Sequence, residues 1–464
     1  MPCLPVYLQR LFALGCTANI VTFQLLLPAK ACAQTRPLAA GSPALSQEAR
    51  RGQFNVEDFG AKCDGTTDDS QAINAATDHA RGSTVAGQLG ARVAFPPGGV
   101  CRHTSTINLT GFRSFPVDIE GAGALLDCEV KESPCIDALD SRYLHVRNLS
   151  ITATGSAIPT IGLQIGLIKS SGSDVQADCN EFDNIKIHGR FSFTAVYNRS
   201  SETTLWNHLI AWNDYAGGPA YSLVMDGYNH WNVQSAFRKV SLSADTPNSF
   251  NENTFITPDL RRVGRGAAIW SGFTYRHRYM GGYIGNSGTP SYGIVLYGSN
   301  DFLDADIHGE SAQYLTDMFF VTAPRGTSSL VLNGLKVRDH SSYANNSIFK
   351  LDPALSKGVA LTNLDIEVGG LVATRVFEDP ARWTVSGIYR LPIKFSAWNL
   401  PASQFSGVAI VGLAASFFGT TSISMTGRAP PSESCTPGEL RSDSDFIYVC
   451  VSTGKWKRAA LSTW

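Results

Sequence analysis

A short unit that recurs along the chain is the feature that most constrains the fold. Residues 182–189, FDNIKIHG, superimpose residue for residue on 302–309, FLDADIHG. Apolar and polar residues alternate with a period of two in each unit, which favours strands over helices. Related units begin at intervals of 18 to 36 residues, at Val146, Trp206, Phe237, Phe255, Tyr279, Leu332 and Leu361. An irregular period with short strands is typical of a solenoid of β-coils with variable loops.

Asparagines support the same interpretation. Asn148, Asn184 and Asn363 occupy one shared position in their units. We expect a stacked ladder of turns there, and a structural role for these side chains.

A block near the N-terminus has its own pattern. FNVEDFGAKCDG from Phe54 predicts a short strand and a glycine-rich turn, and TTDDSQAI then opens a helix capped by Asp and Ser. A strand at 92–95 ends at PPGG. This block resembles the N-terminal segment of the rhamnogalacturonase/epimerase-like pectate-lyase superfamily, whose members are right-handed parallel β-helices. We expect Asp64, Asp68 and Asp69 to shape turns and cap the helix rather than bind calcium.

The resemblance and the repeats together predict an all-β chain. We expect a right-handed parallel β-helix over 52–425, with 52–105 as an N-terminal cap segment that contains one short helix. Residues 426–464 end the chain as a small β-hairpin cap, because FIYVC at 446–450 alternates and a turn follows at Gly454. Residues 34–51 are rich in Ala, Pro, Ser and Gly and predict a flexible linker.

The first 33 residues have the pattern of a signal peptide. A basic start at Arg10 precedes an apolar stretch, and Ala31-Cys32-Ala33 offers a cleavage site before Gln34. An uncleaved membrane anchor is the alternative, although polar residues interrupt the stretch. We expect a secreted or periplasmic protein that has no membrane contact after cleavage.

Cysteine usage agrees with export. Three of the ten cysteines would leave with the signal peptide, so an odd number remains and at least one thiol lacks a partner. Cys435 and Cys450 flank the hairpin pattern and are the favoured pair. The other pairings considered are Cys128 with Cys135 and Cys63 with Cys101. No C-x-x-C spacing occurs among these cysteines, so we expect no zinc or other metal site.

Charge and motifs narrow the function classes. The chain has 38 basic and 39 acidic residues and a net charge of −1, which argues against a nucleic-acid partner. The Asn-Thr-Asp, Asp-Asp and Gly-His-Gly set of polygalacturonase-like relatives is absent from the repeat units, as is the Arg-x-Pro-x-x-Arg pattern of pectate lyases. Catalytic residues therefore cannot be carried over and must come from the register of the units.

Three units, 255–261, 279–285 and 302–308, align without gaps and place Asp259, Tyr283 and Asp306 in one column. Stacked coils lie about 4.8 Å apart, so the two carboxylates are about 9–10 Å apart at the backbone. Their side chains can close this to the range of about 6.5–9.5 Å used by inverting glycosidases. Asp304 shares the face of Asp306 and offers a second pair. We predict Asp306 as general acid and Asp259 or Asp304 as base.

Side chains around this column predict an anionic sugar as ligand. Tyr283 and His308 are expected to orient hydroxyl groups. Four tryptophans of the same stretch are candidates to stack on sugar rings: Trp206, Trp212, Trp231 and Trp270. The expected cationic contacts are Arg261, Arg262, Arg276 and Arg278. The alternative is that the acids are solvated or paired with Arg261 and Arg262, and that the tryptophans pack in the core.

Three functions remain open at this point. The first is glycoside hydrolysis of an acidic, uronate-containing polysaccharide, as in polygalacturonases and rhamnogalacturonases. The second is β-elimination on the same substrate by a pectate-lyase-like enzyme, in which Tyr283, His308 or an arginine removes a proton. The third is a non-catalytic glycan-binding or tailspike-like structural protein. We expect no cofactor, with calcium considered only for a lyase, and a monomer or homotrimer.

Overall fold

The computed structural model describes the chain in segments that begin at residue 52. These are 52–85, 90–113, 116–167, 177–199, 201, 203–226, 231–232, 238–239, 253–272, 277–287, 291–297, 302–303, 306–309, 317–322, 329–331, 335–339, 347–353, 359–368, 375–378, 382–391, 405–411, 414–418, 440–442 and 445–462. The chain divides into two compact units, one up to Ile284 and one from Gly285, and each is described by itself.

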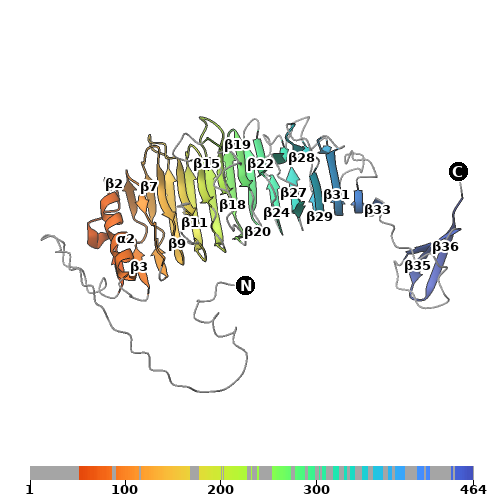
Figure 1. Ribbon diagram of the computed structural model, residues 1–464, viewed down its shortest axis with the longest axis horizontal. Helices are drawn as coiled ribbons and strands as arrows, with labels where there is room; N and C mark the ends of the chain where they lie inside the picture. The colour runs from red at the N-terminus through yellow and green to blue at the C-terminus, as the bar shows by residue number, and fades with distance from the viewer. Residues whose placement is uncertain are drawn as a thin grey trace, which may run out of the picture. The chain divides into compact units, whose positions relative to one another are not determined.

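The first unit consists mainly of parallel strands stacked along two sheets (Figure 1). The first sheet contains β1 (Gln53–Asn55), β3 (Ala91–Ala94), β6 (Val117–Glu120), β9 (Leu144–Ala153), β11 (Glu181–Gly189), β13 (Leu205–Asn213), β17 (Thr254–Ile256) and β20 (His277–Met280), joined by β2 (Asp64–Asp68), β4 (Val100–His103), β7 (Leu125–Cys128), β18 (Asp259–Val263) and β21 (Tyr283–Ser287). The second sheet contains β5 (Ile107–Asn108), β8 (Pro134–Leu139), β10 (Ile161–Gly166), β12 (Thr194–Arg199), β14 (Ala220–Asp226) and β19 (Gly266–Gly272). A short antiparallel pair, β15 (Trp231–Asn232) and β16 (Arg238–Lys239), lies outside both sheets.

The second unit also consists mainly of parallel strands, with an antiparallel pair at the end of its larger sheet. One sheet contains β22 (Ser291–Tyr297), β25 (Asp317–Thr322), β28 (Ser347–Leu351) and β30 (Arg375–Phe377). Another contains β24 (Asp306–Gly309), β27 (Leu335–Asp339), β29 (Val359–Val368), β31 (Trp383–Leu391), β32 (Phe405–Val411), β33 (Ala414–Phe418) and, paired with β29, β26 (Ser329–Val331). A two-residue strand, β23, spans Phe302–Leu303.

The C-terminal residues form a small antiparallel sheet of β34 (Leu440–Ser442), β35 (Phe446–Ser452) and β36 (Lys455–Ala460). The turn between the last two strands contains Gly454, at a φ of 74°. The predicted all-β class, the parallel β-helix and the C-terminal hairpin are therefore confirmed.

An aromatic stack runs through the core of the first unit. Phe182, Trp206, Phe255 and Tyr279 occupy one register column, and each is at most 1% exposed. Their ring centroids are 4.2, 5.8 and 4.8 Å apart in that order. The predicted alignment of Phe255 with Tyr279 is confirmed. The unit expected at Phe237 is wrong as a coil of this sheet, because β13 pairs directly with β17.

A left-handed residue bends the longer strands of the first sheet. Asn148 and Asn184 have φ values of 53° and 52°, and His208 and Thr257 have φ values of 55° and 47° at the matching bend of the next strands. Asparagine tolerates this conformation better than most residues. The Asn184 side-chain amide donates to Asn148 Oδ1 (3.0 Å), which confirms the ladder for these two residues. The side chain of Asn363 is outside the described residues.

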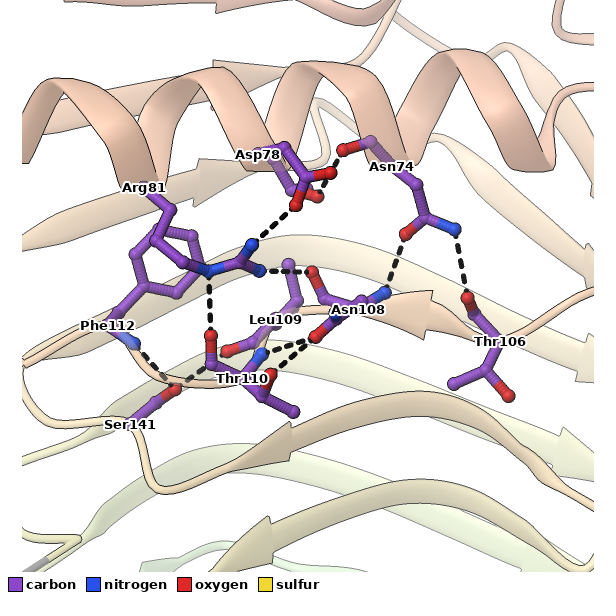
Figure 2. Close-up of polar contacts among 10 residues, drawn as sticks. Asn74, Asp78, Arg81, Thr106, Asn108, Leu109, Thr110, Phe112 and Ser141 are labelled. Atoms are coloured by element: carbon purple, nitrogen blue, oxygen red, sulfur yellow. Dashed lines mark hydrogen bonds and ion pairs between the residues drawn. The ribbon is translucent and has the colours of Figure 1, made fainter. Parts of the chain in front are cut away.

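The predicted helix is α2 (Ser70–Val85), which follows the one-turn 3-10 helix η2 (Val56–Phe59). Figure 2 shows how polar side chains join α2 to the residues around β5. Asn74 donates to the Thr106 carbonyl (3.0 Å) and accepts from the Asn108 amide (2.7 Å). Arg81 donates through Nε to the Thr110 carbonyl (2.8 Å) and through Nη2 to the Asn108 carbonyl (3.0 Å). The helix therefore docks through several directed bonds in addition to its apolar face.

The three N-terminal aspartates shape turns, as predicted. Asp64 accepts hydrogen bonds from Thr66 and Thr67, which lower the pKa of its carboxyl. Asp69 is buried and accepts from the amides of Lys62 (2.7 Å) and Cys63 (3.0 Å). Their oxygens are thus engaged by donors of the local chain.

Two of the disulfides considered are present, Cys63–Cys101 and Cys128–Cys135. Cys450 also takes part in a disulfide. Its favoured partner, Cys435, is outside the described residues. Within the described segments, no helix is both long and apolar enough to span a bilayer.

Candidate functional site

The bend at Asn148 and Asn184 divides the outer face of the first sheet into two halves. Before the bend, charged residues of adjacent strands pair with one another. Arg147 lies 3.5 Å from an Asp118 oxygen and 3.9 Å from a Glu120 oxygen, and His145 lies 3.4 Å from Asp118. Opposite charges on neighbouring strands stabilise a sheet, so this half has a structural explanation.

The half after the bend carries aromatic and charged side chains together. We call it the aromatic–cation strip; its members are Lys186, His188, Trp212, Asp214, Asp259, Arg261 and Tyr283. Register places His188 beside Trp212 and Trp212 beside Arg261. The Tyr283 amide donates to the Pro258 carbonyl (2.6 Å), so Tyr283 follows Asp259 on the next coil. All seven side chains are half-buried or exposed.

Arg261 lies at the centre of three interactions in this strip. Its guanidinium carbon is 4.6 Å from the ring centroid of Trp212 and 4.6 Å from that of Tyr283. Its Nε and Nη2 donate to the two oxygens of Asp259 at 2.7 and 2.9 Å. Aromatic faces attract cations, and two parallel bonds fix a carboxylate. The structure thus joins four residues that the sequence singled out: Asp259, Arg261, Tyr283 and Trp212.

His188 and Asp214 form a second pair in the strip. His188 Nε2 is 2.7 Å from Asp214 Oδ2, and the two side chains are 34% and 38% exposed. The His188 ring meets Trp212 edge-on at 5.3 Å, and the Lys186 ammonium lies 5.9 Å from the Trp212 ring centroid. One tryptophan therefore contacts an imidazole, an ammonium and a guanidinium.

Arg262 is placed differently from the prediction. It is 1% exposed and donates to the carbonyls of Asn213 (2.8 Å), Ala220 (3.0 Å) and Arg265 (3.0 Å). Burial lowers the pKa of its guanidinium to about 10. Because Arg262 binds backbone inside the coil, its predicted contact with a substrate is corrected to a structural role.

Trp270 is also corrected. Its side chain is 2% exposed on β19, so it is not a surface platform for a sugar ring. Arg276 and the side chains of Trp231 and Arg278 are outside the described residues. Their predicted roles stay predictions.

The predicted acids of the second unit are described only at the backbone. Asp306 and His308 lie on β24, where Asp306 pairs in register with Lys336 and His308 with Arg338. Lys336 in turn pairs with Glu367 of β29. The unit alignment, which matches Phe302 with Leu361, predicts Asp365 in the column of Asp306. The strand register instead places Glu367 there. Asp304 is outside the described residues.

The second sheet carries a buried polar cluster that the sequence did not reveal. Tyr197 and Asp226 are both 0% exposed, and the Tyr197 hydroxyl donates to Asp226 Oδ2 (3.0 Å). Burial, with the nearby charge of Asp226, raises the pKa of Tyr197 well above its ordinary value. Burial likewise raises the pKa of Asp137, which shares a register column with Gln164 and Tyr197. A perturbed pKa in a polar cluster marks a candidate functional site.

Of the residues that the sequence analysis did not predict, His188 had a signal in the repeat units, whereas Tyr197 and Asp226 had none. His188 belongs to the unit that aligns with 302–309, and Trp212 follows it by one coil, so the strip followed from unit register. Tyr197 and Asp226 lie on strands that carry no repeated motif. Their contact depends on the pairing of β12 with β14. Because the loops between strands vary in length, the sequence does not show which strands pair.

Comparison with known families identifies the N-terminal part of the chain. Residues 53–128 match the family described as Rhamnogalacturonase A/epimerase, pectate lyase-like. The predicted resemblance is confirmed. The matched segment covers α2, the Cys63–Cys101 disulfide and strands β1 to β7. A search of curated proteins gave no match.

Solved structures provide three comparisons. The mannuronan C-5 epimerase AlgE6 A-module of Azotobacter vinelandii is 16% identical, with 79% of this chain and 96% of that chain covered and a TM-score of 0.43. Endo-xylogalacturonan hydrolase of Aspergillus tubingensis is 12% identical, with coverage of 78% and 99% and a TM-score of 0.44. Tailspike protein 2 of an Escherichia coli O157:H7 bacteriophage is 11% identical, with coverage of 72% and 42% and a TM-score of 0.42.

Proposed function

We propose that this pectate lyase-like protein is exported and hydrolyses an acidic, uronate-containing polysaccharide. The observation that supports this most directly is the aromatic–cation strip, in which Arg261 lies between the rings of Trp212 and Tyr283. Sugars are bound by aromatic surfaces together with charged hydrogen-bonding groups, and arginine matches a carboxylate. The matched family is named after polysaccharide-acting enzymes, which agrees with this ligand class.

In the proposed reaction, Asp306 donates a proton to the oxygen of the leaving sugar. Asp259 or Asp304 accepts a proton from the attacking water. Both oxygens of Asp259 accept hydrogen bonds from Arg261, so Asp259 accepts the proton of the water only after Arg261 releases one of them. Tyr283 and His308 would orient hydroxyl groups of the substrate. The mechanism requires no cofactor.

A second candidate function is glycan binding without cleavage. The two-point contact between Asp259 and Arg261 favours it, because a carboxylate fully engaged by an arginine is also a common structural pair. Both functions share the same ligand class and differ in whether bonds break.

The deciding experiment incubates secreted protein with a panel of acidic polysaccharides. New reducing ends without ultraviolet absorbance support hydrolysis, whereas absorbance of an unsaturated sugar indicates β-elimination. Asp306→Asn keeps the side-chain shape but cannot donate the proton, so we expect turnover to fall about 10²–10⁴-fold. Glu367→Gln is the matched control, since it occupies the same register column, and we expect it to retain activity.

Two results contradict the proposal. If no polysaccharide yields products while several bind, the protein is a glycan-binding protein. If the wild type hydrolyses a substrate and Asp306→Asn is equally active, the catalytic acid is another residue.

A further inference from the structure

We propose that His188 and Asp214 form a sugar-binding subsite beside Trp212, which binds the hydroxyl groups of one acidic sugar residue of the polysaccharide. The inference rests on the proposed function for the class of ligand. It assigns a role to a histidine–carboxylate pair that the proposed hydrolysis does not use.

The geometry of the pair fixes which atoms are offered to a ligand. His188 Nε2 lies 2.7 Å from Asp214 Oδ2, and because a carboxylate oxygen accepts, the imidazole donates from Nε2. The other ring nitrogen, Nδ1, is a second polar atom that bonds a hydroxyl group, since a hydroxyl both donates and accepts. Asp214 has a second carboxylate oxygen, which is an acceptor. The pair thus offers two polar atoms for the hydroxyl groups of a sugar ring.

The loop that carries Asp214 is held from inside the coil. Arg262, almost fully buried, donates to the carbonyls of Asn213 and Tyr215, the residues on either side of Asp214. The Asp214 amide donates to the Gly189 carbonyl (2.8 Å), next to the strand residue His188. Burying a guanidinium is costly unless its donors are satisfied, and here they hold this corner in one position. Binding groups held before the ligand arrives avoid the entropy cost of ordering them.

A second histidine–aspartate pair on the same sheet shows that not every such pair has these surroundings. His145 and Asp118 are 34% and 37% exposed, nearly the same as His188 and Asp214, but their closest atoms are 3.4 Å apart. Asp118 is also contacted by Arg147, which reaches Glu120 as well. That pair belongs to the charge network before the bend. The His188 pair instead adjoins Trp212.

The neighbouring charges indicate an acidic sugar. The Lys186 ammonium lies 5.9 Å and the Arg261 guanidinium 4.6 Å from the Trp212 ring centroid. Arg261 already covers the Trp212 ring and binds both oxygens of Asp259. Lys186, two residues before His188 on the same face of β11, is therefore the cation that meets the carboxylate of a sugar whose hydroxyls meet His188 and Asp214. The ligand class that makes all three contacts is a uronate with free hydroxyls.

Calorimetric titration with size-defined oligouronates tests this, using catalytically silenced Asp306→Asn protein so that the ligand stays intact. His188→Ala and Asp214→Ala are compared with His145→Ala and Asp118→Ala, which remove the same groups at equal exposure. We expect weaker binding for the first two variants only: about 10- to 100-fold for Asp214→Ala, which removes a bond to a charged group, and about 2- to 10-fold for His188→Ala. O-acetylated oligouronates should bind the starting protein more weakly by a similar factor.

Equal affinity of the His188→Ala and His145→Ala proteins would overturn the inference. So would undiminished binding of the O-acetylated ligand. Loss of affinity with an unchanged denaturation midpoint excludes unfolding as the cause. This binding assay is independent of cleavage, so a failure to detect products affects the proposed function alone.

Discussion

The same substitution should affect different properties at the neighbouring residues Arg261 and Arg262: ligand binding at Arg261 and stability at Arg262. We consider replacing each with methionine, which keeps the length of the side chain and removes its charge. Arg261 is 44% exposed and Arg262 is 1% exposed. Arg261→Met therefore tests a surface contact, and Arg262→Met tests an internal contact of the same strand.

The expected magnitude for Arg262→Met follows from its bonds. Three well-formed bonds, to the carbonyls of Asn213, Ala220 and Arg265, contribute about 2 kcal/mol each because the donor is charged. Burial lowers the pKa of Arg262 to about 10, and this shift corresponds to a penalty of about 3 kcal/mol that methionine does not carry. The net loss is therefore about 3 kcal/mol of stability in the first unit.

Arg261→Met should change stability by less than about 1 kcal/mol, because an exposed ion pair contributes little. It should instead weaken binding of an acidic oligosaccharide. Urea denaturation followed by circular dichroism measures the first effect, and titration calorimetry the second. Identical urea midpoints for Arg262→Met and wild type would refute the reasoning, as would a larger loss of stability in Arg261→Met.

Four further outcomes are expected. Tyr197→Phe removes a buried bond to the Asp226 carboxylate and should lower stability by about 1–3 kcal/mol in urea denaturation; an unchanged midpoint contradicts the importance of this contact. Burial opposes ionisation of Asp68, but its hydrogen bonds prevail and lower its pKa to about 2. The stability that the ionised carboxylate contributes above pH 4 is therefore lost as the pH falls toward 2, and Asp68→Asn should flatten that part of the profile of stability against pH. Arg81→Ala should lower the thermal midpoint by loosening α2, with exposed Lys131→Ala as the silent control. Intact mass of exported protein should begin at Gln34, and a full-length product would contradict cleavage.

The fold could be predicted because its signals are local and repeated. Phe255 and Tyr279 align without a gap, and the same side chains stack in the core. Asn184 occupies the bend because few residues adopt its positive φ. The burial of Arg262 could also have been predicted from the sequence, because residues two apart in a strand lie on the same face and Leu260 is apolar.

The site could be predicted only in part. Asp259, Arg261 and Tyr283 were placed together because their units differ by one coil and have equal lengths. Phe237 was placed wrongly, because an apolar residue at a plausible spacing resembles a coil although β13 pairs directly with β17. The contact of Tyr197 with Asp226 joins residues from two coils, and no local pattern encodes it.

The position of α2 has a consequence for how the chain can be shortened. Among the strands that the structure describes, β1 lies at the end of the first sheet and pairs with β3, while α2 contacts β1, β3 and β5 (Figure 1). A strand at the end of a sheet has unpaired backbone groups that can recruit another chain. Removing residues 53–85 would uncover the next strand, β3, with nothing to replace the helix. Such truncated chains would be expected to join end to end into fibres, so trimming for crystallisation or engineering should begin at the C-terminal side.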